Sequence, residues 1–124
     1  MASLLTPRLT EHFGTTAPVL LTATTETTLV AFTPLVDTMV IVDAYVVVQN
    51  AATTLALASA WTDPVTGNTE SQEMTKFEGG SQSLGPSGGD QQFMAQSGGA
   101  VTISATAGTA NNISVHCVVT LKTI

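Results

Sequence analysis

The sequence predicts an all-β protein, an antiparallel β-sandwich of jelly-roll type with an extended N-terminal arm. Thr is the commonest residue of the 124-residue chain, followed by Ala and Val, and the stiff side chains of Thr and Val favour strands over helices. Several apolar runs alternate with period 2, and turn residues separate them about every ten residues, which is typical of sandwiches and jelly rolls. No run has a convincing helical period.

Length and periodicity divide the chain into an arm and one domain. A chain of 124 residues forms a single domain. Residues 1–17 mix Pro, Thr and charged residues without apolar periodicity, so we expect an N-terminal arm there and a single β-sandwich domain over 18–124. Apolar residues in the arm are candidate partner-binding positions, because such a segment can be ordered by docking on a partner. These residues are Leu4, Leu5, Leu9 and Phe13.

Strands are expected from residue 18 onward. Residues 19–25 and 29–32 are the first two, and Pro34 ends the second because it has no N–H for a ladder. The strongest strand covers 38–49. Its even positions from 40 to 48 are all Val or Ala, and period 2 places them on one face. Its other face also carries apolar residues, so both faces of this strand should be covered in part.

The next expected elements are a strand over 53–62, a turn over 63–68 and a polar strand over 69–75 that pairs back across the turn. Pro, Gly, Asp and Asn predict the turn, since each favours turn backbone for its own physical reason. Seven of the ten glycines lie between 78 and 99. We expect a loop there around one short strand over 92–95.

A hairpin is expected at the C-terminus. Apolar residues alternate from 101 to 105 and again from 113 to 121, and Gly108 with Asn111 marks the turn between them. Asn112, at the edge of the second strand, should tolerate substitution by Asp.

Charge excludes two classes of partner. Three basic residues (Arg8, Lys76 and Lys122) face nine acidic ones, for a net charge of −6. Nucleic acids and anionic membrane surfaces require clustered cations, so we expect neither as a partner. The single cysteine excludes an intrachain disulfide. We expect no signal peptide and no membrane span, because the start lacks a basic segment and a long apolar stretch.

Candidate catalytic and metal-binding groups are few, and we expect no catalytic residue, no cofactor and no metal site. His12 and His116 are the imidazoles, and a half-exposed structural role is commoner for such residues than catalysis. Cys117 lies in the apolar register of the last strand and lacks the cationic neighbour that activates a thiol. Asp37 and Asp43 share a strand face but lie about 20 Å apart, too far for paired catalysis.

Two further types of site have candidate residues in the sequence. Asp63, Asn68 and Glu70 form the nearest approach to a calcium loop, but their oxygen ligands are sparse. Trp61 together with Tyr45 could form a sugar-stacking platform, which keeps a carbohydrate-binding β-sandwich open as an alternative function. The other interpretation places Trp61 in the core or in a subunit interface.

The order of strands and turns resembles small β-sandwich proteins of tailed-bacteriophage virions. The segments that carry the resemblance are 46–53 (VVVQNAAT), 61–67 (WTDPVTG), 93–105 (FMAQSGGAVTISA) and 113–117 (ISVHC). The resemblance covers roughly 18–124 and is one of layout, so it carries over no catalytic residue. It implies a structural role in a virion. The first expectation is a capsid decoration (cement) protein, and the alternative is a tail, fibre or baseplate module.

Low charge and a strand that is apolar on both faces also favour self-association. We therefore expect a non-enzymatic protein that forms a homotrimer, binds the major capsid protein or another virion protein, and lies on the capsid exterior in preference to the tail.

Overall fold

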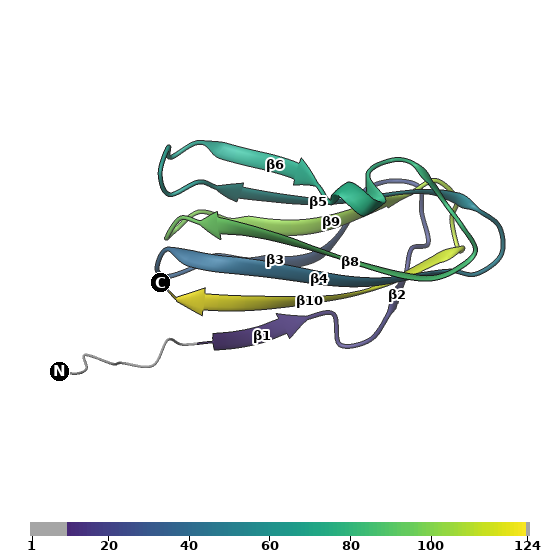
Figure 1. Cartoon of the computed structure of the whole chain (residues 1–124), viewed down its shortest axis with the longest axis horizontal. Helices are drawn as coiled ribbons and strands as arrows, with labels where there is room; N and C mark the ends of the chain where they lie inside the picture. Colours follow the sequence, from purple (N-terminus) through teal and green to yellow (C-terminus); the bar gives the residue numbers. More distant parts are fainter. Residues whose placement is uncertain (1–9, 124) are drawn as a thin grey trace.

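The computed structural model describes residues 10–123, whose regular elements are all strands apart from one short 3-10 helix (Figure 1). The described elements in chain order are β1 (Thr10–Gly14), β2 (Val19–Leu20), β3 (Thr27–Phe32), β4 (Thr38–Val48), β5 (Thr53–Thr62), β6 (Thr69–Glu73), the 3-10 helix η1 (Thr75–Phe77), β7 (Ser81–Gln82), β8 (Gly85–Ala95), β9 (Val101–Ala107) and β10 (Ile113–Thr123).

Two antiparallel sheets form a sandwich, which confirms the predicted fold class. The first sheet has the order β1-β10-β4-β8, and β2 pairs with the same edge of β10 as β1 does. The second sheet has the order β3-β9-β5-β6, and β7 pairs with β5. With β1 and β2 counted as one interrupted edge strand, and β6 and β7 as another, each sheet has four strands and the chain passes repeatedly between them. This is the jelly-roll arrangement.

Part of the segment expected to be an arm is a strand of the first sheet. β1 pairs with β10 from Thr10 opposite Lys122 to Gly14 opposite Val118. The Thr15 N–H then donates to the carbonyl of Cys117 at 2.9 Å. The physical reason lies in β10, whose 11 residues are longer than β2 can cover. β1 supplies partners for backbone groups along the rest of that edge.

The glycine-rich segment forms a long strand where the sequence predicted a loop with a short strand. β8 has 11 residues and pairs with β4 along its whole length, from Thr38 opposite Ala95 to Val48 opposite Gly85. Glycine is needed here for space. A Cβ at Gly89 would lie 2.7 Å from Cε2 of Phe77, which is fully buried. The lack of a side chain lets β8 pass over the Phe77 ring.

The predicted C-terminal hairpin is wrong. β9 pairs with β3 and β5 in the second sheet, whereas β10 pairs with β1, β2 and β4 in the first. Each strand has one apolar face, and in opposite sheets these two faces pack against each other across the core. The connection crosses the end of the sandwich. There the buried Asn112 accepts hydrogen bonds at Oδ1 from the N–H groups of Asn50 (2.8 Å) and Ala51 (3.3 Å), and donates from Nδ2 to the Ala51 carbonyl (2.7 Å).

The core confirms the predicted alternation within the strands. The even residues of β4 and the odd residues of β5, β9 and β10 point inward, and nearly all of them are buried. Trp61 is 8% exposed and stacks on Phe93 with ring centroids 4.2 Å apart. The inward side chains of both sheets therefore form one continuous core.

Candidate interaction surface

Of the predicted partner-binding residues, only Phe13 lies within the described part of the chain. Leu4, Leu5 and Leu9 lie outside the described residues. Phe13 belongs to β1, where its backbone pairs with Val119 of β10. The backbone of β1 begins at the end of the sandwich where β10 finishes (Figure 1).

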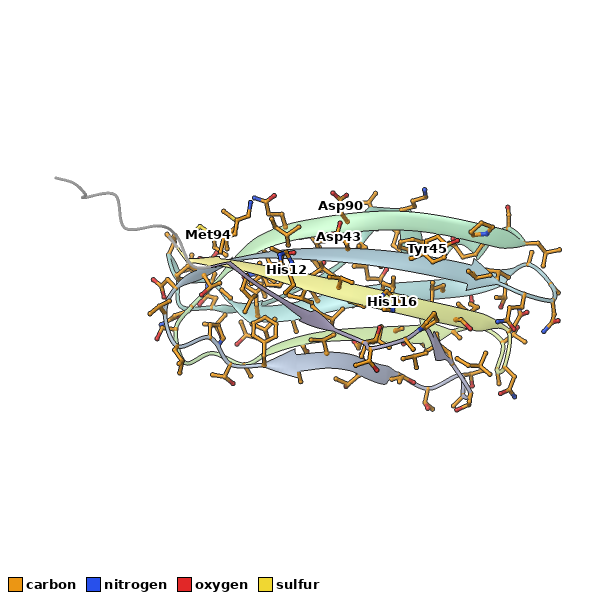
Figure 2. The ribbon with its side chains drawn as sticks, turned by 90° about the horizontal axis from the view of Figure 1, so that it is seen from below. His12, Asp43, Tyr45, Asp90, Met94 and His116 are labelled. Atoms are coloured by element: carbon orange, nitrogen blue, oxygen red, sulfur yellow. The ribbon has the colours of Figure 1, made fainter. Side chains whose placement is uncertain are left out.

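The outer face of the first sheet, called the front face below, is the first candidate surface. Figure 2 labels six of its residues, spread over β1, β10, β4 and β8. The front face consists of Met39, Ile41, Asp43, Tyr45 and Val47 on β4; Ser114, His116, Val118, Thr120 and Lys122 on β10; Pro86, Gly88, Asp90, Gln92 and Met94 on β8; and His12 on β1.

The front face is unusually apolar for a sheet surface that no other layer of the described chain covers. An antiparallel sheet with one solvated face normally alternates apolar and polar residues. On β4, four of the five front-face residues are apolar, namely Met39, Ile41, Tyr45 and Val47. Tyr45 is 52% exposed, and the other three are half-buried. We expected both faces of β4 to be covered in part. In a single copy of the chain, only the face toward the core is covered.

Two carboxylates stand side by side in the middle of the front face. Asp43 of β4 and Asp90 of β8 are direct cross-strand partners, and both are exposed (Figure 2). Like charges directly opposite each other in a sheet are destabilising. Among residues 10–123, neither carboxylate has a hydrogen-bond or ion-pair partner. The folded domain thus keeps an unfavourable charge pair exposed to solvent.

The two histidines hold β1 and the chain after it on β10. His12 Nδ1 lies 3.0 Å from the hydroxyl of Thr120, and His116 Nδ1 lies 3.2 Å from the hydroxyl of Thr15. The same Thr15 oxygen accepts a hydrogen bond from the Cys117 N–H at 3.0 Å. Both imidazoles therefore make contacts between β10 and residues 12–15.

Cys117 is an inert core residue. Its side chain is fully buried, and burial first, then the charge of Asp43, raise the pKa of its thiol from 9.0 to about 11. A thiol with such a pKa is protonated at neutral pH and is a poor nucleophile.

The candidate catalytic and calcium-binding carboxylates lie far apart or accept hydrogen bonds from backbone N–H groups. Asp37 accepts a hydrogen bond from the Ser97 N–H at 2.9 Å, at one end of the sandwich, while Asp43 lies in the front face. Asp63 accepts one from the Val65 N–H at 2.7 Å, which makes it the first residue of a turn. Within residues 10–123, no three His, Cys, Asp or Glu side chains gather as they would around a metal ion.

Trp61 and Tyr45 do not form the aromatic platform that sugar binding would require. Trp61 lies in the core against Phe93, whereas Tyr45 points outward from the other sheet. The two side chains are on opposite sides of the first sheet. The interpretation of Trp61 as a core residue is the one the structure supports.

A second surface, at the end of the sandwich, was missed from the sequence. Leu35 in the β3–β4 loop is 92% exposed and Val65 in the β5–β6 loop is 87% exposed. Both loops lie at the same end as the first residue of β1 and the last of β10 (Figure 1). A large apolar residue directly after each of Pro34 and Pro64 was the available signal. We call Leu35 and Val65 the loop tips.

Hydrogen bonds hold both loop tips in place. Ser97 donates from its hydroxyl to the Leu35 carbonyl at 3.0 Å, and Gly98 donates to the Pro34 carbonyl at 2.8 Å. Around Val65, the Gly67 N–H donates to the Asp63 carbonyl at 2.8 Å. Loops already ordered in this way lose little conformational entropy when they bind a partner.

Comparison with solved structures identifies viral capsid proteins as neighbours in fold. The VP2 subviral particle of infectious bursal disease virus matches 93% of this chain with a TM-score of 0.60 and 9% identity. VP2 of the Gx strain matches 94% with a TM-score of 0.52 and 8% identity, and a mutant VP2 in T=1 particles matches 94% with 0.51 and 11%.

The likeness is one of fold. This chain spans about a third of each VP2 chain, namely 32%, 30% and 31%. No protein-family model and no curated protein matches the sequence. The domain is therefore a β-sandwich that shares its fold with part of VP2. The residues 10–123 include no helix that is long and apolar enough to span a membrane.

Proposed function

We propose that this chain is a virion structural protein that decorates the outer shell of a tailed-bacteriophage capsid as a homo-oligomer and binds the major capsid protein. The observation that carries the proposal is the match of 93% of the chain to a capsid protein that forms subviral particles. The layout of strands and turns that resembles phage virion proteins supports the choice of a tailed phage.

The surface chemistry favours a role in contacts over a role in catalysis. Cys117 is buried and protonated, and both histidines are held by threonine hydroxyls. An open depression of about 370 Å³ near the start of β5 is lined by Thr, Ala, Leu and Gly and carries no titratable side chain. We propose that the protein has no enzymatic activity. Hydrolysis assays with glycan, peptide and ester substrates should show no turnover, and a turnover lost on His116→Ala would contradict this proposal.

Attachment to the shell occurs, in this proposal, through the end of the sandwich that carries the loop tips. Leu35 and Val65 project there on ordered loops. β1 begins at the same end (Figure 1), and the sequence before it, residues 1–9, contains the apolar candidates Leu4, Leu5 and Leu9. Burying a Val or Leu side chain contributes about 1.5–3 kcal/mol, so a few such residues supply a useful binding free energy.

The location is tested on purified virions of the virus that encodes the chain. Mass spectrometry should find the protein there, and immunogold labelling should distribute it over the capsid exterior. Labelling confined to the tail would favour the tail, fibre or baseplate alternative. Absence from purified virions would overturn a structural role.

The attachment surface is tested with particles that lack the protein. Deletion of residues 1–9 leaves β1 intact, so the domain should stay folded and lose binding. Leu35→Asp with Val65→Asp should also weaken binding, because charge replaces the apolar tips. Leu84→Asp is the matched control, since Leu84 is 58% exposed and directly precedes β8, which begins beside the last residue of β4, at the other end of that strand from the β3–β4 loop. Full binding by both the deletion and the loop-tip variant would show that attachment uses another surface.

A further inference from the structure

We propose that the front face binds the front face of a second copy across a two-fold axis, with Lys122 of each copy against the Asp43–Asp90 pair of the other. The proposal specifies the self-association included in the proposed function. It does not require a virion, because the protein alone suffices to test it.

The register of the first sheet arranges the front face in rows that run across the strands. One row contains Lys122, Met39 and Met94. The next row contains His12, Thr120, Ile41 and Gln92. The third contains Gly14, Val118, Asp43 and Asp90. Successive rows are two residues, or about 7 Å, apart along the strands.

The charges on the front face cannot neutralise one another within one copy. Lys122 and Asp43 are two rows apart, which is about 14 Å along the strands. All three charged side chains are exposed, and no described residue pairs with any of them. The face therefore presents a cation in one row and two anions two rows away.

A two-fold axis along the middle row brings these charges together. Such an axis lies in the interface, maps the middle row onto itself and exchanges the two outer rows. Lys122 of one copy then lies over Val118 of the other, one strand from Asp43, and its long, flexible side chain can reach the carboxylates. Because the contact is isologous, the same pairing occurs twice. The front face is thus complementary in charge to itself.

Uncharged side chains provide the remaining contact. On the axis, Ile41 faces its own copy, and the exchange of the outer rows places Met39 and Met94 over the acidic row. Gln92 donates from Nε2 to Sδ of Met39 at 3.1 Å, which holds that side chain within the face. Sheets that pack face to face in this way lie about 10 Å apart.

The size of the contact places it among the weak interfaces. The overlap covers four strands about 4.8 Å apart and about six residues at 3.4 Å each, a flat patch of roughly 400 Å² per copy. Stable interfaces bury about 800 Å² per partner, so the dimer should be reversible and concentration-dependent. The sequence led us to expect three copies, but a cyclic trimer contains no two-fold axis.

Sedimentation velocity on the full chain is the first test. The 12.7 kDa chain should sediment as a monomer at low concentration and approach twice that mass at about 0.5 mM, if the Kd is near 100 μM. Raising the salt concentration to about 1 M should weaken the dimer, because it screens the charge pairs. A monomer at all concentrations, or a species of three copies, would overturn the proposal.

Charge reversal is the second test. Lys122→Glu should weaken the dimer at least about tenfold, and Asp43→Lys with Asp90→Lys should do the same, since each places like charges in contact. An equimolar mixture of these two variants should form a heterodimer, because each face then meets its opposite. Failure of the mixture to associate would refute the charge pairing even if both variants are monomeric.

Matched controls separate this contact from a general effect of net charge. Lys76→Glu makes the same charge change as Lys122→Glu, but at an exposed position of η1. Glu70→Lys with Glu73→Lys makes the same change as the double aspartate variant, but on β6. Both controls should dimerise like the wild type. If the double aspartate variant does not fold, Asp90→Lys alone replaces it. Equal loss of the dimer in the controls would contradict a specific front-face contact.

Discussion

Two neighbouring glycines in β8 offer a test of this strand, which the sequence did not predict. Gly88 and Gly89 point to opposite faces of the first sheet, and neither has a positive φ. A Cβ at Gly88 would lie 3.5 Å from the Ala44 carbonyl oxygen, an ordinary contact on the exposed side. At Gly89 it would lie 2.7 Å from the buried Phe77 ring. The same substitution should therefore have opposite effects at adjacent positions.

The magnitudes follow from two opposing contributions. Replacing Gly by Ala reduces the entropy of the unfolded chain, which stabilises the fold by about 0.4–1 kcal/mol where the site has room. Overpacking a core costs about 1–3 kcal/mol, because Phe77 is enclosed and its ring cannot rotate away without moving its neighbours. Gly88→Ala should thus be neutral or stabilising. Gly89→Ala should be less stable than Gly88→Ala by about 1–3 kcal/mol, the full cost of the overpacking.

Urea unfolding followed by the fluorescence of Trp61 measures the difference, since Trp61 is the single tryptophan and lies in the core. With an m-value of about 2 kcal/mol/M, a gap of 2 kcal/mol separates the two midpoints by about 1 M. In a Phe77→Leu background the gap should shrink, because the smaller side chain leaves room for the new methyl group. Equal midpoints for both variants would refute the register of β8 over Phe77, and with it the position of Asp90 opposite Asp43.

Three further predictions concern the core, one connection and pH. Val115→Asp should unfold the domain, because it buries an unpaired charge at a cost of several kcal/mol, whereas Ser114→Asp on the opposite face should stay folded by circular dichroism. Asn112→Asp, expected from the sequence to be neutral, should lower the free energy of unfolding by about 1–3 kcal/mol, because it replaces the donor to the Ala51 carbonyl by an acceptor. Asn68→Asp in an exposed turn is the control. Equal urea midpoints for the two variants would contradict the hydrogen bonds of Asn112. The pKa of Cys117 is raised in the fold from 9.0 to about 11, so the native state holds its proton more tightly. That stabilisation is complete below about pH 9 and is lost as the pH rises to about 11. The wild type should therefore lose more stability than Cys117→Ala between about pH 8 and pH 10.5. Equal losses would count against the burial of the thiol.

The short-range pattern of the sequence predicted the strands and their inward faces. Alternation over 38–49 and 53–62 identified the core residues of β4 and β5, and the Asp63–Asn68 turn with its following strand was also correct. These features depend on contacts between residues near in sequence, or on which face of a strand is apolar. Period 2 carries that information directly.

Three local predictions failed because a distant partner decides the outcome. The glycine-rich segment 85–95 forms a strand because β4 pairs with it along its whole length, and Phe77 leaves no room for a side chain at Gly89. Residues 10–14 form a strand because the edge of β10 is open to them. The sequence predicts Asn112 to be an exposed residue at a strand edge, but the loop at 50–51 folds over it. None of these partners can be recognised from the residues beside each position.

The sequence by itself determined that this chain is an all-β sandwich and which of its residues face the core. Only the tertiary structure decided which sheet each strand joins. The run from 101 to 121 buries the same side chains whether β9 and β10 pair as a hairpin or face each other across the core, so its alternation cannot distinguish the two. The choice depends on the neighbours that β3, β4 and β5 offer, and that same choice brings Asp43, Asp90 and Lys122 onto one face.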